Sequence, residues 1–242
     1  MCVNKNIYIF FSILIFLSGV HGSSTIKEVK KEITVTQKKQ NFKDVLVPIV
    51  SEVFRKLESE YLSVKSDIQN SKNLKNIEKL KKEYSVKTNE ALLIALKPHP
   101  ISVVLAQAAV ESAWLTSRFT KEANNIFGVW SFNKNEPRIA ASGLRGDKTI
   151  YLKKYKTLNA AILGYYKNLG KHRAYKKFRK KRIETNDPYI LSAYLTNYSE
   201  TREKYTNLLK SIIKYNKFEN YDLKSNIPLQ IKENQKIKSD NI

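Results

Sequence analysis

Apolar residues recur every three or four positions along most of the middle of the chain, and this period predicts a protein built mainly from helices. Between residues 42 and 57 the apolar side chains keep this spacing, which predicts an amphipathic helix. Pro48 lies inside that stretch, so the helix either begins at Pro48 or bends there. The same period predicts two shorter helices at residues 74–84 and 89–96.

The most continuous apolar stretch follows Pro98 and Pro100, which break the chain, and runs from residue 101 to about residue 120. Small and apolar side chains occupy it almost all round, and neither Gly nor Pro occurs in it before Gly128. These features predict one central helix that is buried on nearly every side.

Glu111 is a carboxylate inside this apolar segment, and a buried Glu usually has a partner or a chemical role. On a helical period Gln107, Glu111, Trp114 and Arg118 share one stripe, which predicts one wall of a sugar site. The residues alone leave two interpretations open. Either Glu111 is a surface or ion-paired residue, for example with Arg118, or its apolar neighbours raise its pKa so that it donates a proton near neutral pH.

The pattern changes after Trp130. Residues 131–155 have no helical period and contain two short β-leaning pieces, around Ile139 and at residues 149–152. They predict a small hairpin or an irregular lobe. Since all other periodic segments are helical, the predicted fold class is α+β, mainly α.

Cap residues mark three helices in the last third of the chain. Residues 158–169 lie between Thr157, a predicted N-cap, and Gly170, a predicted C-terminal cap. The Asn-Asp-Pro sequence at 186–188 predicts the start of a helix over residues 189–196. Ser199 is the predicted cap of a final helix that ends near residue 214.

Residues 1–24 have the features of a secretory signal, with Lys5 before an apolar run at 7–17 and small residues after it. The run is too short for a comfortable membrane span, and an uncleaved anchor is the alternative. The only cysteine, Cys2, precedes the run, so the mature protein has no thiol chemistry or disulfide. The remaining divisions that we predict are a polar lead-in (25–40), one folded domain (41–216) and a flexible polar tail (217–242).

The 242-residue chain carries a formal net charge of +22. This excess of positive charge favours binding to an anionic partner. The candidates are nucleic acid, an anionic membrane surface and an acidic cell-wall polymer. An export signal argues against nucleic acid. Lysines are spread along the whole chain, so the charge does not identify a substrate, and the basic run at 176–182 is interpreted as a solvated face.

Two stretches of the central segment, QAAVESAWLTSRF and EANNIFGVW, resemble the core motif of a bacterial N-acetylglucosaminidase family that cleaves peptidoglycan. This is the mannosyl-glycoprotein endo-β-N-acetylglucosaminidase-like group, which includes flagellar and autolysin glucosaminidases. Segments 38–50 and 198–212 are similar to the flanks of its Bax-like branch, so the resemblance covers roughly residues 38–215. It implies a lysozyme-like fold in which a helical lobe and a small β-hairpin lobe flank a cleft.

The resemblance also implies roles for single residues. Glu111 matches the catalytic carboxyl, the general acid that protonates the departing oxygen. Tyr198 matches a cleft tyrosine that orients the acetamido group or stabilises charge. Asn124, Asn125 and Phe127 match a turn that closes the site, and from the residues alone this turn is a helix terminator with Gly128 at positive φ. The two interpretations of the turn are compatible.

Further site residues are weaker candidates. Gln107 and Trp130 are expected to bind substrate. Trp114 and Tyr165 could also stack on sugar rings, although we favour core packing for Trp114. For the second catalytic group the chain shows no clear match to the acidic residue of some family members, and Glu136 and Asp147 are the nearby acids. The substrate's own acetamido group or a water held by polar groups are the alternatives.

No cofactor is expected, and neither is a metal, because after export only His99 and His172 remain as histidines and no ligand spacing is present. The sequence therefore predicts an exported, monomeric glycoside hydrolase of the periplasm or cell envelope. It would act on peptidoglycan glycan strands, cut after N-acetylglucosamine, and neither bind nucleic acid nor insert stably into a membrane once the signal is removed. Cleavage at N-acetylmuramic acid, as by a lysozyme or lytic transglycosylase, and an inactive wall-binding protein are the alternatives.

Overall fold

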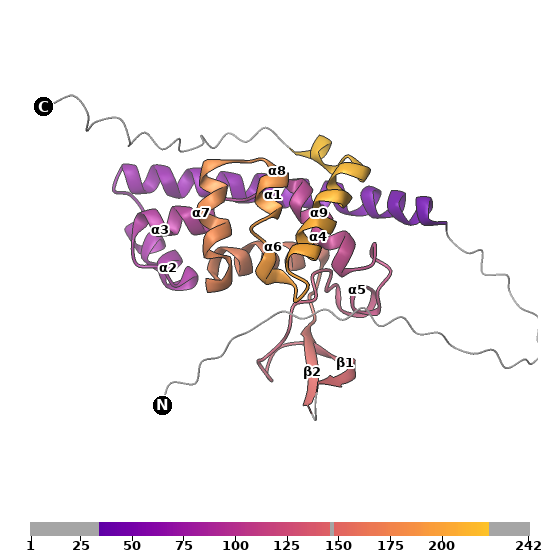
Figure 1. The fold of residues 1–242 in the computed structure, drawn as a ribbon. Coiled ribbons are helices and arrows are strands. Elements are labelled where there is room, and N and C mark those ends of the chain that lie inside the picture. Colours follow the sequence, from indigo (N-terminus) through magenta and orange to yellow (C-terminus); the bar gives the residue numbers. More distant parts are fainter. Residues whose placement is uncertain (1–33, 146–147, 223–242) are drawn as a thin grey trace, which may run out of the picture.

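The computed structural model describes residues 34–145 and 148–222, and these form a helical body from which a two-stranded sheet projects (Figure 1). The predicted signal segment and position 147 lie outside the described residues. The elements, in chain order, are α1 (Val35–Gln69), α2 (Leu74–Tyr84), α3 (Asn89–Leu96), α4 (Ile101–Glu111), α5 (Arg118–Ala123), β1 (Arg138–Arg145), β2 (Lys148–Lys153), α6 (Leu158–Lys171), η1 (Arg173–Tyr175), α7 (Lys176–Glu184), α8 (Pro188–Ser192), η2 (Thr196–Tyr198), α9 (Glu203–Asn216) and η3 (Phe218–Tyr221). The predicted α+β, mainly α class is confirmed.

Helix α1 is the longest element in the described part of the chain, with 35 residues. Thr34 and Gln37 form a capping box at its start, since each side chain bonds the backbone of the other residue. Pro48 lies inside the helix, so it neither begins nor ends the element. Residues 35–40, which were assigned to the polar lead-in, are therefore helical, and most of them are exposed as polar residues should be.

Helix α4 lies in the centre of the body and packs against α1, α8, α9 and η3. All of its residues except Val110 are buried, as the apolar sequence predicts. The helix ends at Glu111, much earlier than the predicted end near residue 120. The prediction that Trp114 and Arg118 share one helical stripe with Gln107 and Glu111 is therefore wrong, because the helix ends at Glu111.

The chain leaves α4 through a left-handed turn in which Ala113, Trp114 and Leu115 have φ of 50°, 61° and 65°. Such angles cost energy in residues that carry a side chain. The hydroxyl of Ser112 offsets part of that cost, because it donates to the Ala108 carbonyl and accepts from the Leu115 N–H. The turn directs Trp114 onto Phe42 of α1, with the ring centroids 5.1 Å apart, so core packing is confirmed for Trp114.

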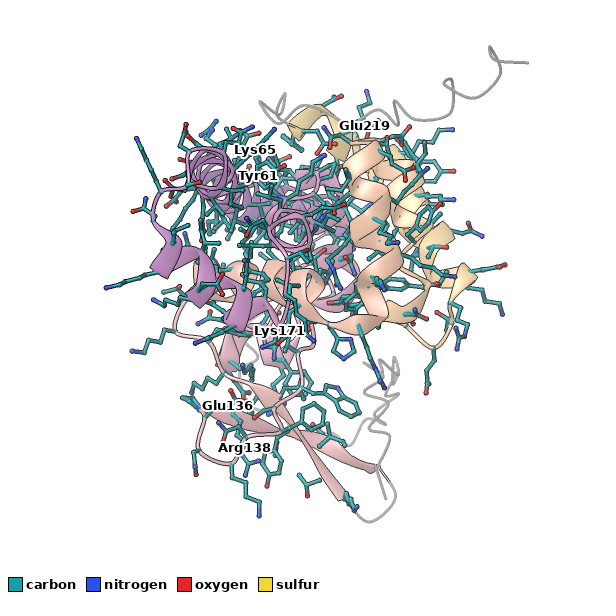
Figure 2. All side chains as sticks on the ribbon, turned by 90° about the vertical axis from the view of Figure 1, so that its left-hand side faces the viewer. Tyr61, Lys65, Glu136, Arg138, Lys171 and Glu219 are labelled. Carbon is teal, nitrogen blue, oxygen red and sulfur yellow. The ribbon has the colours of Figure 1, made fainter. Side chains whose placement is uncertain are left out.

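Strands β1 and β2 form an antiparallel hairpin with an irregularity between Ala140 and Leu144. This confirms the predicted hairpin. Figure 2 shows the lobe, marked by Glu136 and Arg138, standing apart from the body that carries Tyr61 and Lys65. The guanidinium of Arg118 donates to the Ala140 carbonyl at 2.7 Å and so ties α5 to β1.

Two predicted caps are wrong. Helix α6 continues through Gly170 to Lys171 and is capped by His172, so Gly170 is an interior residue. Helix α9 begins at Glu203, after a cap residue Arg202 with φ 45°, and Ser199 instead bonds Thr201 in the preceding turn. Asp187 is confirmed as the N-cap of α8, which ends at Ser192, before the predicted residue 196.

The ordered helical body also extends beyond the predicted domain end at residue 216. Phe218 in η3 is fully buried in the main core, and Asp222 bonds the first turn of α4. Residues 217–222 are therefore part of the fold, and the assignment of a flexible tail from residue 217 is wrong for them. Residues 223–242 lie outside the described part.

In the described part of the chain, no single helix has both the length and the apolar composition to cross a bilayer. Helices α3 and α4, bent by 60° relative to each other, satisfy that criterion only as a pair. Buried side chains from both helices belong to the two hydrophobic cores of the protein.

Candidate active site

Glu111 occupies the last turn of α4, where the helix delivers it into the interior next to the left-handed turn. Its side chain is only 3% exposed. Burial raises the pKa of the Glu111 carboxyl to about 8, although the hydrogen bond from Tyr205 acts in the opposite direction. The interpretation as a surface or ion-paired residue is therefore wrong, and the carboxyl is protonated in most molecules at pH 7.

The two oxygens of Glu111 have different surroundings. Oε1 accepts a hydrogen bond of 2.8 Å from the hydroxyl of Tyr205 in α9. Oε2 is buried and has no hydrogen-bond partner in the described part of the chain. A buried polar atom without a partner is costly, which makes Oε2 the atom with unused capacity for chemistry.

Behind Glu111 a line of buried hydrogen bonds crosses the core. Tyr205 Oη accepts from Gln107 Nε2 at 2.9 Å, and Gln107 Oε1 accepts from the hydroxyl of Tyr165 at 2.5 Å. Tyr165 Oη lies 3.0 Å from His99 Nε2. Burial holds the pKa of His99 well below its ordinary value, so the imidazole is neutral.

Gln107 does not fit the predicted contact with substrate. Its side chain is completely buried, and both ends of its amide are bonded within the core, one to Tyr205 and the other to Tyr165. Tyr165 is likewise fully buried, so it is unsuited to stack on a sugar ring. Both residues instead support Glu111 from inside the protein.

Tyr198, the predicted cleft tyrosine, lies in the same cluster. Its ring stacks on that of Tyr205, with centroids 5.7 Å apart and planes 3° from parallel. Its hydroxyl donates to the Phe127 carbonyl at 3.2 Å, and its exposed fraction is 2%. Burial raises its pKa well above the usual range, and the charge of Glu111 adds to this rise. Tyr198 is therefore a neutral hydroxyl that holds the turn after α5.

That turn contains the Asn-Asn-x-Phe-Gly sequence. Asn124 ends α5 with φ of 50°, and its amide donates to the Tyr155 carbonyl. Asn125 donates to the carbonyls of Val129 and Lys153 and accepts from the Val129 N–H, so it connects the turn to β2. Through these bonds Asn124 and Asn125 hold the shape of the turn. Gly128, the last residue of this sequence, has the predicted positive φ, 62°.

Phe127 completes the turn from the inside. Its fully buried ring stacks on Tyr165 with centroids 4.1 Å apart and an interplanar angle of 15°. The turn is thereby packed against the hydrogen-bonded line that leads to Glu111. Asn124, Asn125 and Phe127 therefore connect the β lobe to the hydrogen-bonded residues behind Glu111.

The β lobe holds the remaining candidates. Glu136 accepts from Ser131 Oγ at 2.8 Å and pairs with Lys153 Nζ at 3.0 Å, so its carboxylate is engaged within the lobe. Asp147 lies outside the described residues. Trp130 forms an antiparallel bridge with Leu152 and is half-buried, with its ring 6.0 Å from that of Phe132. Phe132 is 63% exposed and was not recognised from the sequence.

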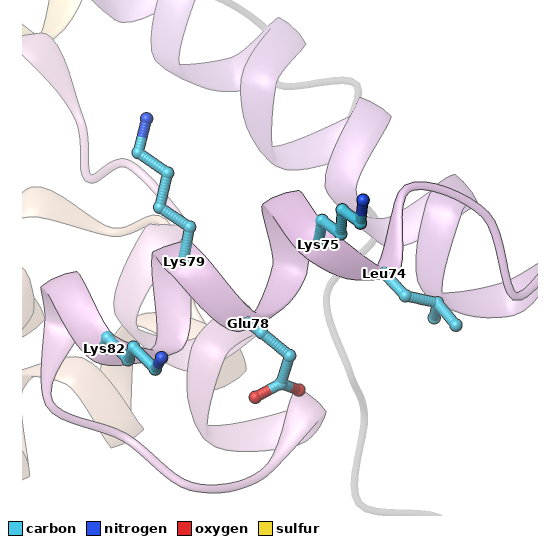
Figure 3. Close-up of a pocket in the computed structure, with 5 residues that line it drawn as sticks. All are labelled: Leu74, Lys75, Glu78, Lys79 and Lys82. Carbon is cyan, nitrogen blue, oxygen red and sulfur yellow. The ribbon is translucent and has the colours of Figure 1, made fainter.

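The surface of α2 has a hollow of about 500 Å³. The five side chains that line it, drawn in Figure 3, all come from this helix: Leu74, Lys75, Glu78, Lys79 and Lys82. Its carboxylate, Glu78, is exposed and pairs with Lys81 at 2.8 Å. This geometry lacks the buried acid that glycosidic chemistry requires. Within the described residues no group of three or more His, Cys, Asp or Glu is placed to hold a metal ion.

Comparison with known proteins identifies the family. The family model described as mannosyl-glycoprotein endo-beta-N-acetylglucosaminidase matches residues 90–218, just over half of the chain. The chain belongs to the glucosaminidase family. Within this glucosaminidase domain, the matched residues contain Glu111 and every member of the hydrogen-bonded line behind it.

Among curated proteins, Protein bax from Escherichia coli (strain K12) is similar to the glucosaminidase chain, with 29% identity over 116 residues. The match covers 46% of this chain and 40% of Protein bax, so the chain spans less than half of that relative's length. The predicted Bax-like membership of the family is confirmed.

Two solved structures are similar to the glucosaminidase chain. The catalytic domain of the autolysin Auto from Listeria monocytogenes matches with a TM-score of 0.50 and 17% identity over 78% of this chain and 90% of that one. A C-terminally truncated glycoside hydrolase domain of FlgJ from Salmonella typhimurium matches with a TM-score of 0.39 and 21% identity over 57% of this chain and 97% of that one. The match to Auto shows a shared fold.

The sequence predicts Glu111, Gln107 and Tyr198 as site residues of this glucosaminidase domain, but it does not predict Tyr205 or the place of His99 in the hydrogen-bonded line. Tyr205 lies seven positions after Tyr198, inside segment 198–212, whose sequence indicates only the family resemblance. From the sequence, His99 is expected only as a possible metal ligand, and nothing local points to its bond with Tyr165.

Proposed function

We propose that the protein is an exported glycoside hydrolase that cleaves the β-1,4 bond after N-acetylglucosamine in peptidoglycan, with Glu111 as the general acid. The observation that carries this proposal is a buried carboxyl with a pKa raised to about 8, in a chain of the glucosaminidase family. A carboxyl that is still protonated at pH 7 can give its proton to a departing glycosidic oxygen.

The oxygen that gives this proton is Oε2, because Oε1 is engaged with Tyr205. Since Oε2 is buried, a glycosidic oxygen reaches it only if side chains around it move aside when substrate binds. The half-buried ring of Trp130 and the exposed ring of Phe132 offer apolar faces in the β lobe on which sugar rings can stack. Tyr198 is the proposed partner of the substrate's acetamido group, and its buried hydroxyl reaches that group only if its bond to the Phe127 carbonyl opens when substrate binds.

The test is release of soluble fragments from purified peptidoglycan, followed by reduction and mass spectrometry. Wild-type protein should release fragments that end in reduced N-acetylglucosamine. Glu111→Gln should be slower by about 10² or more, the usual contribution of a general acid, while its circular dichroism is unchanged. Glu78→Gln is the matched control, because Glu78 is an exposed carboxylate of α2, and its rate should equal that of wild type.

The products also separate the alternatives. Fragments that end in N-acetylmuramic acid, reduced or as an anhydro sugar, would assign cleavage to the lysozyme or lytic transglycosylase type. Binding to the wall without any release would leave an inactive wall-binding protein. Glu136→Gln, tested in the same assay, should lose 10² or more in rate, on the order expected for a catalytic carboxylate, if Glu136 is the second group. It should only destabilise the β lobe if its role is the ion pair with Lys153.

Export is tested separately. The full chain, expressed with a C-terminal tag in a bacterial host, should be recovered from the cell envelope fraction with its N-terminus near residue 25. Recovery of the intact N-terminus with the membrane would favour the uncleaved anchor, and recovery from the cytoplasm would contradict export. In sedimentation the proposed monomer should have the mass of one chain at every protein concentration.

A further inference from the structure

The hydrogen bonds behind Glu111 have a direction, and that direction follows from the number of protons that each group carries. A phenol hydroxyl has one proton to donate, whereas a primary amide donates from nitrogen and accepts at oxygen. The Tyr165 hydroxyl donates to Gln107 Oε1, so the proton shared with His99 has to come from the imidazole. His99 is therefore protonated on Nε2 and bare on Nδ1, an atom that is buried with no partner in the described part of the chain.

The next steps follow in the same way. Because Oε1 of Gln107 is occupied by Tyr165, the amide nitrogen faces Tyr205 and donates to its hydroxyl oxygen. The single proton of Tyr205 is then free to point only toward Glu111. Glu111 Oε1 is thus an acceptor in both ionisation states, and the acidic proton is left on Oε2.

We propose that His99, Tyr165, Gln107 and Tyr205 form a polarised hydrogen-bond chain that presents Glu111 as an acceptor through Oε1 and keeps its transferable proton on Oε2. The inference rests on the proposed role of Glu111 as general acid. In it Tyr205 is a positioning residue that acts through Glu111, and the other three set the direction of the Tyr205 hydroxyl. After proton transfer the same bond stabilises the carboxylate that remains, because a hydrogen bond to an ionised acceptor is stronger than one to a neutral acceptor.

The members of the chain come from three helices and from the segment before α4, so the packing of these elements fixes the geometry of the chain. His99 precedes α4, Tyr165 is on α6, Gln107 and Glu111 are on α4, and Tyr205 is on α9. All four supporting side chains are buried, with exposed fractions of 4% or less. Because these side chains are buried, water cannot replace a hydrogen bond that is lost from the chain. If one hydroxyl or amide turns the other way, the donor and acceptor of the next bond exchange roles.

The groups whose ionisation is coupled to that of Glu111 are tyrosines from four elements: Tyr165, Tyr175, Tyr198 and Tyr205. Burial raises the pKa of each of them above its usual value, so they are neutral wherever Glu111 titrates. A change in the ionisation of Glu111 after removal of the Tyr205 hydroxyl is therefore due to the lost bond.

The first arm of the test reads the direction of the chain without any substrate. Nitrogen NMR of full-length protein with ¹⁵N-labelled histidine, assigned by comparison with His21→Gln and His172→Gln, reports which nitrogen of His99 carries the proton. The Nε2-protonated neutral form is expected. The Nδ1-protonated form would overturn the proposal, because Tyr165 would then donate to His99 and every later bond would reverse.

The second arm uses Tyr205→Phe, which removes one hydroxyl and keeps the ring. On soluble glycan strands its kcat should fall by roughly ten- to a hundredfold, the size expected for loss of a bond to an ionisable group, with little change in KM. The alkaline limb of its pH profile should move to higher pH, since the Tyr205 bond holds the pKa of Glu111 down. Tyr165→Phe should shift both quantities in the same direction by a smaller amount, because the Gln107 amide is then free to turn.

Tyr166→Phe is the matched control, since it also removes one buried hydroxyl, which bonds the His99 backbone carbonyl outside the chain. Its kcat and pH profile should match those of wild type. A Tyr205→Phe protein with the rate and pH profile of wild type would overturn the proposal. If wild-type protein cleaves no glycan, the proposed function fails, and carbon NMR titration of Glu111 still decides the present inference: Tyr205→Phe must raise the pKa of Glu111, and an unchanged pKa contradicts it.

Discussion

Asp222 caps the helix that carries Glu111 through two bonds to Ser102. The Ser102 backbone N–H donates to Oδ1 at 2.7 Å, and the Ser102 hydroxyl donates to Oδ2 at 2.6 Å. The N-cap residue itself, Pro100, makes no side-chain capping bond, so the carboxylate from the other end of the described chain takes over this function. The negative charge also lies at the favourable end of the helix dipole.

The first prediction is that Asp222→Ala lowers the free energy of unfolding by about 1–2 kcal/mol, the usual cost of losing a helix N-cap. Urea denaturation followed by circular dichroism measures it. Asp44→Ala is the control, because Asp44 is an exposed carboxylate of α1 whose bond to Gln40 lies on the surface, and its effect should stay within about 0.5 kcal/mol. Equal effects of the two substitutions would show that the bonds between Asp222 and Ser102 contribute nothing measurable to stability.

The second prediction concerns the stability cost of the raised pKa of Glu111. Its pKa is about 8 in the folded protein, above the ordinary 4.5, so its contribution to stability is fully present below about pH 4.5 and is lost as the pH rises through 8. Glu111→Gln cannot ionise. The variant should therefore gain stability relative to wild type between pH 5 and pH 9, by more than about 2 kcal/mol, since each pKa unit corresponds to about 1.4 kcal/mol.

Urea denaturation of both proteins at pH 5 and pH 9 gives this difference, and the ionisation of all other groups cancels because it is common to both. A gap between the proteins that stays constant with pH would mean that Glu111 titrates normally. For Glu78→Gln, at the exposed end of a surface ion pair, the difference in free energy of unfolding from wild type should be the same at pH 5 and pH 9.

The third prediction follows from the unexpected place of Gly170 inside α6. A Cβ atom at this position would lie 2.8 Å from the Ala95 carbonyl oxygen and 2.9 Å from Tyr84 Cε1. A backbone carbonyl cannot move aside cheaply, so Gly170→Ala should destabilise the protein by about 1–3 kcal/mol. In Gly143→Ala the new methyl group meets nothing within 4 Å, and its effect on the urea midpoint should be negligible. Stabilisation by Gly170→Ala would contradict the close approach of α3 to α6.

The helices were predictable from sequence wherever one face had to be buried. The boundaries of α2 and α3, and the hairpin after Trp130, follow from local periodicity. The end of α4 was not predictable, because no Gly or Pro follows Glu111 before Gly128 and nothing local requires positive φ at Ala113. The competing interaction is tertiary, since the turn allows Trp114 to pack on Phe42 and Phe218.

In the candidate site an acid among alanines is a local signal that singles out Glu111, while its role as general acid follows only from the family resemblance. Its support comes from residues far away in sequence: Tyr205 is 94 positions and Tyr165 54 positions beyond it. Gly170 has the composition of a cap, but its close approach to Ala95 of α3 requires a glycine inside α6, whereas Ser199 bonds Thr201 in the local turn before α9. The basic run at 176–182 misled in the same way, because it includes Arg182, which is 1% exposed.

Arg182 and Lys97 form a reciprocal arrangement of buried cations and helix ends. Arg182 Nη2 donates to the carbonyls of Ile94 and Ala95 in the last turn of α3. Lys97, which follows α3, donates to the Arg182 carbonyl in the last turn of α7 at 2.6 Å. Each cation thus lies at the negative end of the other's helix. Burial, together with the charge of Arg182, lowers the pKa of Lys97 to about 8.

The last prediction is a pH dependence of opposite sign to that of Glu111. The folded pKa of Lys97 is below its ordinary 10.5, so its contribution to stability is fully present above about pH 10.5 and is lost as the pH falls through 8. Lys97→Met keeps the apolar stem and removes the charge. Wild type should therefore gain about 1–3 kcal/mol over the variant between pH 7 and pH 10.5, measured by urea denaturation. For Lys79→Met, on the exposed face of α2, the difference in free energy of unfolding from wild type should not change with pH. If the difference for Lys97→Met were equally independent of pH, Lys97 would be fully charged and hydrated in the folded protein.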